Sequence, residues 1–358
     1  MADENNNAWL GLLKWSLAYS DGTKAVDTTK MNPEDIQFLE KVMSEGIIDE
    51  GERMKSILKD LTDSLEMMLG SNNDSSKQEE KLKELDEDDM LELLQELRDI
   101  VEQIDYARAF MSLGGIQFLL GCATYHAPPG GNTIPKSLRK ATLGVLSTMC
   151  QNNPPVQLSL LEHGHMPQLI GLFFDYSNGN DQGDDVDDSI REKVVQALSA
   201  SIRGHSMAEH IFCKNDQGLM MLKLGLGMQS RGPKPSAQLR KRSLFLLRAL
   251  LTSDDVTSDE RCTQYQDIIS FVCTHMVNEE WEDEAENREM AVSILTQLLS
   301  KEGVVAKQEI LKHKVNLGVV GLKRIQEIRS LEEGSDERDY ATLELEAWEQ
   351  LMVAFANN

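Results

Sequence analysis

The sequence predicts an all-α solenoid, a right-handed stack of about four to five three-helix repeats with capping helices at both ends. Four segments begin with a similar three-residue pattern whose second residue is arginine, and each then continues as an amphipathic helix. The arginines stand at positions 139, 191, 240 and 288, so the spacings are 52, 49 and 48 residues. A period of about fifty residues is longer than one helix hairpin and indicates a three-helix unit.

Composition supports helix-on-helix packing. Hydrophobic residues make up 41% of the 358-residue chain and aromatic residues only 5%, so the core is built mainly from aliphatic side chains. The formal net charge of −24 disfavours nucleic acid and anionic membrane surfaces as partners, because both attract lysine and arginine.

Two short regions precede the repeats. Residues 1–30 are predicted to be a flexible segment that contains an apolar motif, Trp9 to Leu17. Capping helices are expected over 31–70, the first beginning at Asn32-Pro33 and the second carrying Met54, Ile57, Leu61 and Leu65 on one face. An acidic linker follows over 71–86.

The repeats are expected over 87–330, and a capping helix over 331–358. Each repeat should contain a short, a medium and a long helix. The long third helices are predicted at 138–150, 190–202, 239–251 and 290–299. Glycines mark bends at Gly114-Gly115, Gly164 and Gly218. Residues 252–266 are expected to be an irregular acidic connection.

No pattern indicates catalysis. The sequence has no glycine-rich phosphate loop, no nucleophile elbow and no zinc-protease motif. The five cysteines are far apart and form no CxxC pair, which indicates reduced thiols. We therefore expect no enzyme, no catalytic residue, no metal and no cofactor. The chain shows no secretory signal, so a cytoplasmic location is expected, with nuclear entry left open.

Two charged runs allow two interpretations each. Residues 231–242 hold five basic residues and no acid, which either balance neighbouring acidic loops or contact an acidic partner. The acidic run from Glu279 to Glu284 is expected to be a solvated loop, although Trp281 leaves a partner contact open.

Several segments together resemble one family. These are Leu12 to Gly22, Met54 to Leu61, Val101 to Gly115 and Cys150 to Pro154. In this order and spacing they resemble the armadillo-type nucleotide exchange factors of seventy-kilodalton, DnaK-class heat-shock chaperones. The resemblance implies an armadillo-like fold and a monomeric co-chaperone that binds the chaperone's ATPase domain through a concave face. ADP would then leave, and the client would be released.

The resemblance also implies site residues. The partner-binding residues on the concave face would be Ala107, Arg191, Arg240, Arg242, Phe245 and Arg248. Alignment on the repeated arginine also predicts inward-facing positions at Gly144, Thr148, Gln196, Ala200 and Ala249. In the family the N-terminal segment is thought to imitate a client, which Leu13, Trp15 and Leu17 would do here; docking on the first repeat is the alternative. The competing function is an armadillo-type scaffold or peptide-binding adaptor without exchange activity.

Overall fold

The computed structural model describes residues 49–70, 85–177, 187–228, 233–253, 258–301 and 303–357. The chain divides into two compact units, Met1–Ser56 and Ile57–Asn358. The apolar motif with Leu13, Trp15 and Leu17, the helix expected after Pro33 and most of the 71–86 linker lie outside the described residues.

The first unit is described only at its end, where helix α3 (Glu50–Leu69) begins. Asp49 starts this helix, because its Oδ1 accepts hydrogen bonds from the backbone N–H groups of Gly51 and Glu52 at 3.0 and 3.1 Å. The rest of α3 belongs to the second unit, and the helix predicted through Met54 and Leu65 is confirmed.

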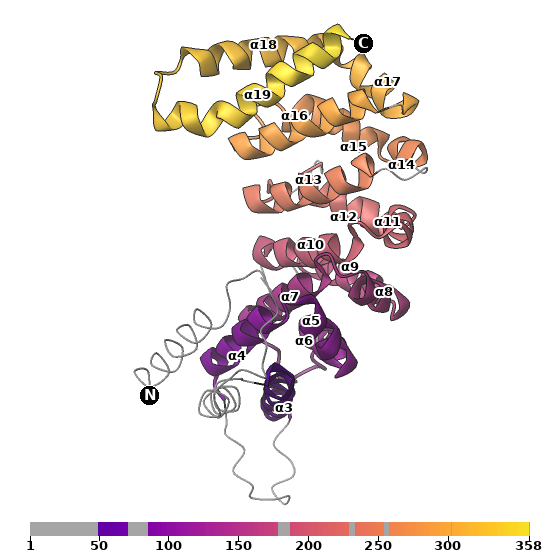
Figure 1. Ribbon diagram of the computed structural model, residues 1–358, viewed down its shortest axis with the longest axis vertical. Coiled ribbons are helices and arrows are strands. Elements are labelled where there is room, and N and C mark those ends of the chain that lie inside the picture. The colour runs from indigo at the N-terminus through magenta and orange to yellow at the C-terminus, as the bar shows by residue number, and fades with distance from the viewer. Residues whose placement is uncertain are drawn as a thin grey trace, which may run out of the picture. The chain divides into compact units, whose positions relative to one another are not determined.

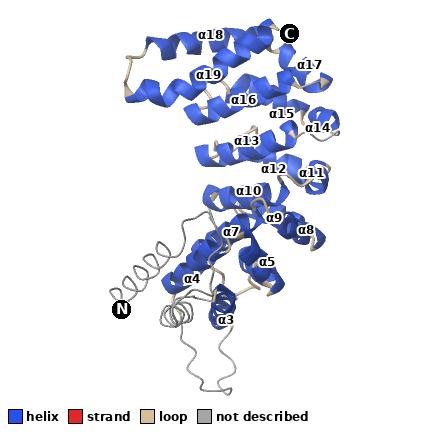
Figure 2. Ribbon diagram, viewed as in Figure 1, coloured by secondary structure: helices blue, strands red, loops and turns tan. Residues whose placement is uncertain are grey.

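The second unit is a stack of three-helix layers, and its described residues contain no strand (Figures 1 and 2). The predicted all-α solenoid is therefore confirmed. The first helices of the five layers are α5 (Ile104–Ser112), α8 (Pro154–Glu162), α11 (Ser206–Cys213), α14 (Ser258–Gln264) and α17 (Val304–Lys312). The second helices are α6 (Gly115–Thr124), α9 (His165–Asp175), α12 (Asp216–Leu226), α15 (Gln266–Phe271) continued by the π-helix η2 (Val272–Met276), and α18 (Lys314–Ser330).

The third helices form their own row along the stack (Figure 1). They are α7 (Lys136–Cys150), α10 (Asp188–Ile202), α13 (Ala237–Thr252), α16 (Ala285–Ser300) and α19 (Asp336–Ala356), and α4 (Glu87–Ile100) precedes them in the same row. Consecutive members pack directly on one another. The helix expected to cap the C-terminal end is α19, which occupies the third-helix place of the last layer.

The glycine bend of the first layer has a clear cause. Gly114 adopts a left-handed backbone, with φ of 86°, between α5 and α6. At Gly115 an added Cβ would lie 2.2 Å from the Phe110 ring, so only glycine lets the two helices approach this closely. The turn predicted at Gly114-Gly115 is thus confirmed, and both of its residues need to be glycine.

One element differs from the sequence prediction. Residues 252–266 were expected to be irregular, yet they contain α14, which begins at Ser258. Buried contacts stabilise this short acidic helix. Arg261 Nη1 donates to Glu209 Oε2 of α11 at 2.8 Å, and the Tyr265 side chain is fully buried. Tertiary contacts therefore outweigh a local sequence that has no amphipathic pattern.

The repeated arginine is part of the packing between layers. Arg139, Arg191, Arg240 and Arg288 are all buried, with exposed fractions of 7%, 5%, 3% and 2%. Arg139 illustrates the role, because its Nη1 donates to the carbonyl oxygen of Ala123 at the end of α6 at 2.6 Å. It thereby satisfies a helix-terminal carbonyl group that would otherwise be unpaired.

Towards the C-terminal end the same arginine forms buried ion pairs. Arg240 makes a bidentate pair with Glu282, both bonds being 2.6 Å long. Arg288 pairs with Glu344 of α19 through bonds of 2.8 and 2.9 Å. Arg324 of α18 also donates to Glu344, so this carboxylate joins the last three long helices.

Candidate functional site

The predicted contact residues divide into buried and accessible groups. Ala107, Arg191 and Arg240 are at most 5% exposed. Arg191 pairs with Asp188 at 2.7 Å and covers the Phe173 ring, while Arg240 is held by Glu282. These three side chains are not available to a partner, and we correct the prediction that they form a contact surface.

Arg242, Phe245 and Arg248 remain accessible. They lie at three-residue spacing on α13 and therefore share one helix face. Arg242 and Arg248 are half-buried, and Phe245 is 36% exposed. The guanidinium carbon of Arg203, just after α10, lies 4.4 Å from the centre of the Phe245 ring. This distance is in the range of a cation–π interaction.

The other predicted inward-facing positions are mostly small or half-buried. Gly144 and Ala200 are buried, whereas Thr148, Gln196 and Ala249 are half-buried. Thr148 Oγ1 accepts a hydrogen bond from Arg98 Nε of α4 at 3.0 Å. Arg98 was not predicted from the sequence, and it leads to the main feature of this row of helices.

Six basic side chains, which we call the basic strip, lie on or directly after four third-row helices. They are Arg98, Lys140, Lys193, Arg203, Arg242 and Arg248. None of the six forms an ion pair with another described residue. This is unusual in a chain with a net charge of −24, where most described basic side chains outside the strip have an acidic neighbour.

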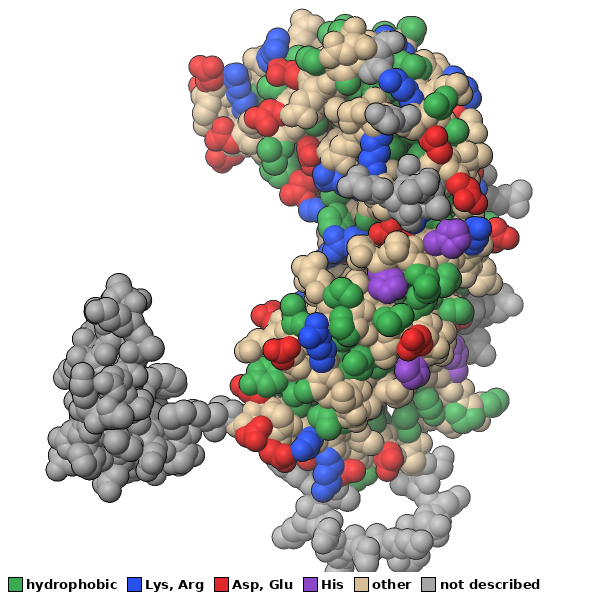
Figure 3. All heavy atoms as spheres, turned by 45° about the vertical axis from the view of Figure 1, so that its right-hand side comes forward, with side chains coloured by type: hydrophobic (Ala, Val, Ile, Leu, Met, Phe, Trp, Pro, Cys, Tyr) green, Lys and Arg blue, Asp and Glu red, His purple; other side chains and the backbone are tan. Residues whose placement is uncertain are grey.

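The strip is electrostatically crowded. Burial lowers the pKa of the Lys193 ammonium, and the nearby charges of Arg98, Arg242 and Lys140 lower it further. Lys193 therefore lies among cations that come from α4, α7 and α13. In the space-filling view the surface curves inward at the middle layers, and basic side chains lie beside this hollow (Figure 3).

The basic residues at 231–242 mainly balance acidic residues of the same chain, which is one of the two interpretations that the sequence allowed. Lys234 pairs with Asp283 at 2.9 Å, Arg240 pairs with Glu282, and Lys241 pairs with Glu286. In the stretch from 279 to 284, Glu282 is completely buried, whereas Glu279, Glu280, Asp283 and Glu284 are exposed, so the structure departs from the expected solvated loop at Glu282. Of the described basic residues in the run, Arg242 alone faces outward without an acidic partner among the described residues.

Trp281 is part of this packed corner. Its side chain is half-buried and meets the Phe271 ring edge-on, with ring centres 5.1 Å apart. Lys234 Nζ lies 5.0 Å from the centre of the indole ring. Trp281 is therefore held by contacts within its own chain, and the partner contact left open from the sequence stays a prediction for its exposed part.

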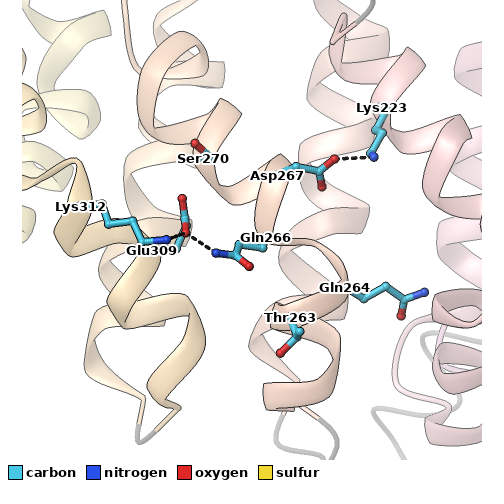
Figure 4. A pocket seen from close by; sticks show the side chains of 8 residues that line it. All are labelled: Lys223, Thr263, Gln264, Gln266, Asp267, Ser270, Glu309 and Lys312. Carbon is cyan, nitrogen blue, oxygen red and sulfur yellow. Dashed lines mark hydrogen bonds and ion pairs between the residues drawn. The ribbon is translucent and has the colours of Figure 1, made fainter.

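A polar cavity of about 520 Å³ lies on the opposite row, between α12, α14, α15 and α17. Its charged groups interact with one another: Lys223 pairs with Asp267, and Glu309 accepts hydrogen bonds from Gln266 and Lys312 (Figure 4). Because these groups already have partners, the cavity offers less to a ligand than the basic strip does.

Two further observations concern chemistry and membranes. In the part of the chain that is described, no group of three or more His, Cys, Asp and Glu side chains could hold a metal ion. All five cysteines are free and buried, as expected from their spacing. Across the same residues no helix combines the length and the hydrophobicity needed to span a bilayer.

Structural comparison finds solved chains that are similar at low sequence identity. A chain of an engineered protein aligns with a TM-score of 0.50 and 14% identity, covering 83% of this chain and 97% of that one. A second engineered protein has a TM-score of 0.46 with 14% identity, covering 75% and 56%. A chain from a structure of Kap95p with RanGDP has a TM-score of 0.48 and 12% identity, covering 90% and 33%. At 14% identity, the similarity to the first engineered protein concerns the fold alone.

Sequence comparison is more specific. No curated protein sequence matches the chain. A family model does match, over residues 10–110, and it is described as nucleotide exchange factor Fes1. The match covers three of the segments that carried the resemblance, namely Leu12 to Gly22, Met54 to Leu61 and most of Val101 to Gly115. The predicted resemblance to the exchange factors of seventy-kilodalton heat-shock chaperones is therefore confirmed over residues 10–110.

Proposed function

We propose that this protein is a co-chaperone that promotes ADP release from a seventy-kilodalton heat-shock chaperone, and that it binds the ATPase domain with the basic strip. The observation that carries the proposal is the match of residues 10–110 to a nucleotide exchange factor family. The unpaired cations of the strip support the location of the contact.

The physical mechanism needs no catalytic residue. A binding protein accelerates nucleotide release if it binds the open form of the ATPase domain more tightly than the closed form. To shift a two-state equilibrium from 1:99 to 99:1 it needs a preference of about 10⁴-fold for the open form. A rigid stack of packed helices suits this task, because it cannot adapt equally to both forms.

The strip suits an acidic partner surface. Its guanidinium groups can pair bidentately with carboxylates, and Phe245 adds an accessible apolar contact at the same place. Arg203 is already held against the Phe245 ring, which reduces the entropy lost when a partner binds. In this arrangement Arg242, Phe245 and Arg248 are the central contacts, and the protein acts as a monomer in the cytoplasm.

The N-terminal segment has a separate proposed role. Leu13, Trp15 and Leu17 would occupy the chaperone's client site and so promote client release. Deleting residues 1–30 should then leave ADP release unchanged and slow the release of a bound client peptide. Slower ADP release in the truncated protein would contradict this division of roles.

The test of exchange activity is the release rate of fluorescent ADP from a purified cytosolic chaperone. With stoichiometric protein the rate should rise severalfold. If the protein binds the chaperone and the release rate stays the same, exchange activity is rejected. The armadillo-type scaffold that binds peptides then becomes the better description.

A further inference from the structure

Lys193 on α10 is surrounded by cations from neighbouring helices. Arg98 approaches it from α4 by lying across the intervening helix α7. Arg98 Nε donates to Thr148 Oγ1 at 3.0 Å, and an added Cβ on Gly144 would lie 3.9 Å from Arg98 Nη1. These two contacts place the Arg98 guanidinium on the surface of α7.

The remaining cations complete the group. Arg242 stands on α13 and Lys140 stands on α7, the two helices of the row that pack on α10. Both charges contribute to lowering the pKa of the Lys193 ammonium, after burial and Arg98. Glu192 opposes this shift, but its Oε1 already accepts a hydrogen bond from Ser236 Oγ at 2.6 Å. Four positive charges are thus gathered at a half-buried place with one shared carboxylate beside them.

We propose that the Lys193 cluster, formed by Arg98, Lys140, Lys193 and Arg242, is a binding site for a multivalent oxyanion of the phosphate or polyphosphate class. Such an anion would compensate the repulsion among the four cations. It would accept charge-assisted hydrogen bonds from two guanidinium and two ammonium groups. Half-burial strengthens these interactions relative to those of fully exposed lysines.

The site has a consequence for the partner. The same cations belong to the basic strip, so a bound polyphosphate would compete with an acidic protein surface. This consequence rests on the proposed function, whereas binding of the oxyanion itself does not. Free phosphate compounds would then set how strongly the protein holds its partner.

The experiment uses the full-length protein alone, without any chaperone. Calorimetry and thermal unfolding are measured with inorganic pyrophosphate and with ADP, at constant ionic strength maintained with sodium chloride. Saturable binding with a rise in Tm is expected for a ligand that binds only the folded state. The ligand with the higher affinity identifies the source of the phosphate groups, inorganic or nucleotide.

A matched pair of variants locates the site. Lys193→Gln should weaken binding about tenfold or more, since a charged hydrogen-bonding group is lost. Lys307→Gln is the control: Lys307 is also half-buried and has no ion pair within the described part of the chain, but it lies on α17 in the other row. The Lys307→Gln variant should bind pyrophosphate with the same affinity as the unaltered protein.

Two results would overturn the proposal. One is that neither pyrophosphate nor ADP binds saturably when sodium chloride keeps the ionic strength constant. The other is that Lys193→Gln and Lys307→Gln lose affinity equally. Arg242→Gln provides a second test from a different helix, and unchanged affinity in that variant also contradicts the site. Because no chaperone is present, these outcomes leave the proposed exchange activity to its own assay.

Discussion

The third helices carry two sets of basic side chains whose environments differ completely. The repeated arginines at 139, 191, 240 and 288 are buried and bind carbonyl groups or carboxylates of their own chain. The basic strip lies on the same row of helices, is partly accessible and forms no ion pair within the described residues, although Glu289 lies near Arg248 and Glu192 near Lys193. The difference teaches that a regularly repeated charge can hold the layers together, while an irregular set is free to bind a partner.

Removing a repeated arginine should have the largest effect. Arg288→Met removes one of the two guanidinium groups that hold the buried Glu344 carboxylate and leaves Arg324 as its remaining partner, so we expect a loss of about 3–4 kcal/mol of unfolding free energy. Urea unfolding gives the free energy of unfolding of Arg288→Met and of Arg242→Met. The loss should be much smaller in Arg242→Met, because Arg242 forms no ion pair within the described residues. Similar losses in the two variants would break the distinction between the two sets.

A buried histidine should give the next largest effect. Burial, and then the neighbouring His163, lowers the pKa of His165 to about 4 from an ordinary value of 6.5. Its side chain is 2% exposed and its Nδ1 has no hydrogen-bond partner. The unfolded state therefore binds a proton first as the pH falls.

The sign of the pH dependence follows from this order. Stability should be lost as the pH falls from about 6.5 to about 4, by up to roughly 3 kcal/mol from this residue, because each pKa unit is worth about 1.4 kcal/mol. Equilibrium unfolding of the unaltered protein and of His165→Leu across this range isolates the contribution. An unchanged slope in His165→Leu would show that other groups cause the pH dependence.

Charge reversal in the strip should affect binding and leave folding intact. Arg242→Glu combined with Arg248→Glu should weaken binding to the chaperone's ATPase domain by about 2–5 kcal/mol if these charges are desolvated in the interface. Calorimetry measures the affinity, with Arg329→Glu on α18 as the control. A loss below about 1 kcal/mol would place both arginines at the rim of the interface or outside it.

The smallest effect concerns repulsion within the strip. Lys193→Met removes one charge from a crowded group, so the protein should become slightly more stable, by about 0.5 kcal/mol or less. Thermal unfolding at low salt is the sensitive measurement, because salt screens the repulsion. Marked destabilisation would mean that Lys193 has a structural partner.

The sequence predicted much of the architecture. Helical periodicity placed the third helices at 138–150, 190–202 and 239–251, and the structure has them at 136–150, 188–202 and 237–252. It missed α14, because that helix is acidic and depends on the buried pair between Arg261 and Glu209. A contact between residues so far apart in the chain leaves no local pattern.

The site was predicted only in part, for a related reason. Arg240 was expected at the surface because its local run is basic, but its partner Glu282 follows 42 residues later. The sequence does contain a signal for the members of the strip. Helices α7 and α13 contain no Asp or Glu, although the chain has 60 acidic residues, so Lys140, Arg242 and Arg248 have no carboxylate one turn away.

The most direct measurement compares ADP release from the chaperone with increasing amounts of the unaltered protein and of Arg242→Glu/Arg248→Glu. We predict a severalfold acceleration by the unaltered protein, a shift of the variant's titration to about tenfold or higher concentration, and unfolding curves that coincide. Equal acceleration at equal concentration would contradict the account, because exchange would then not depend on the basic strip.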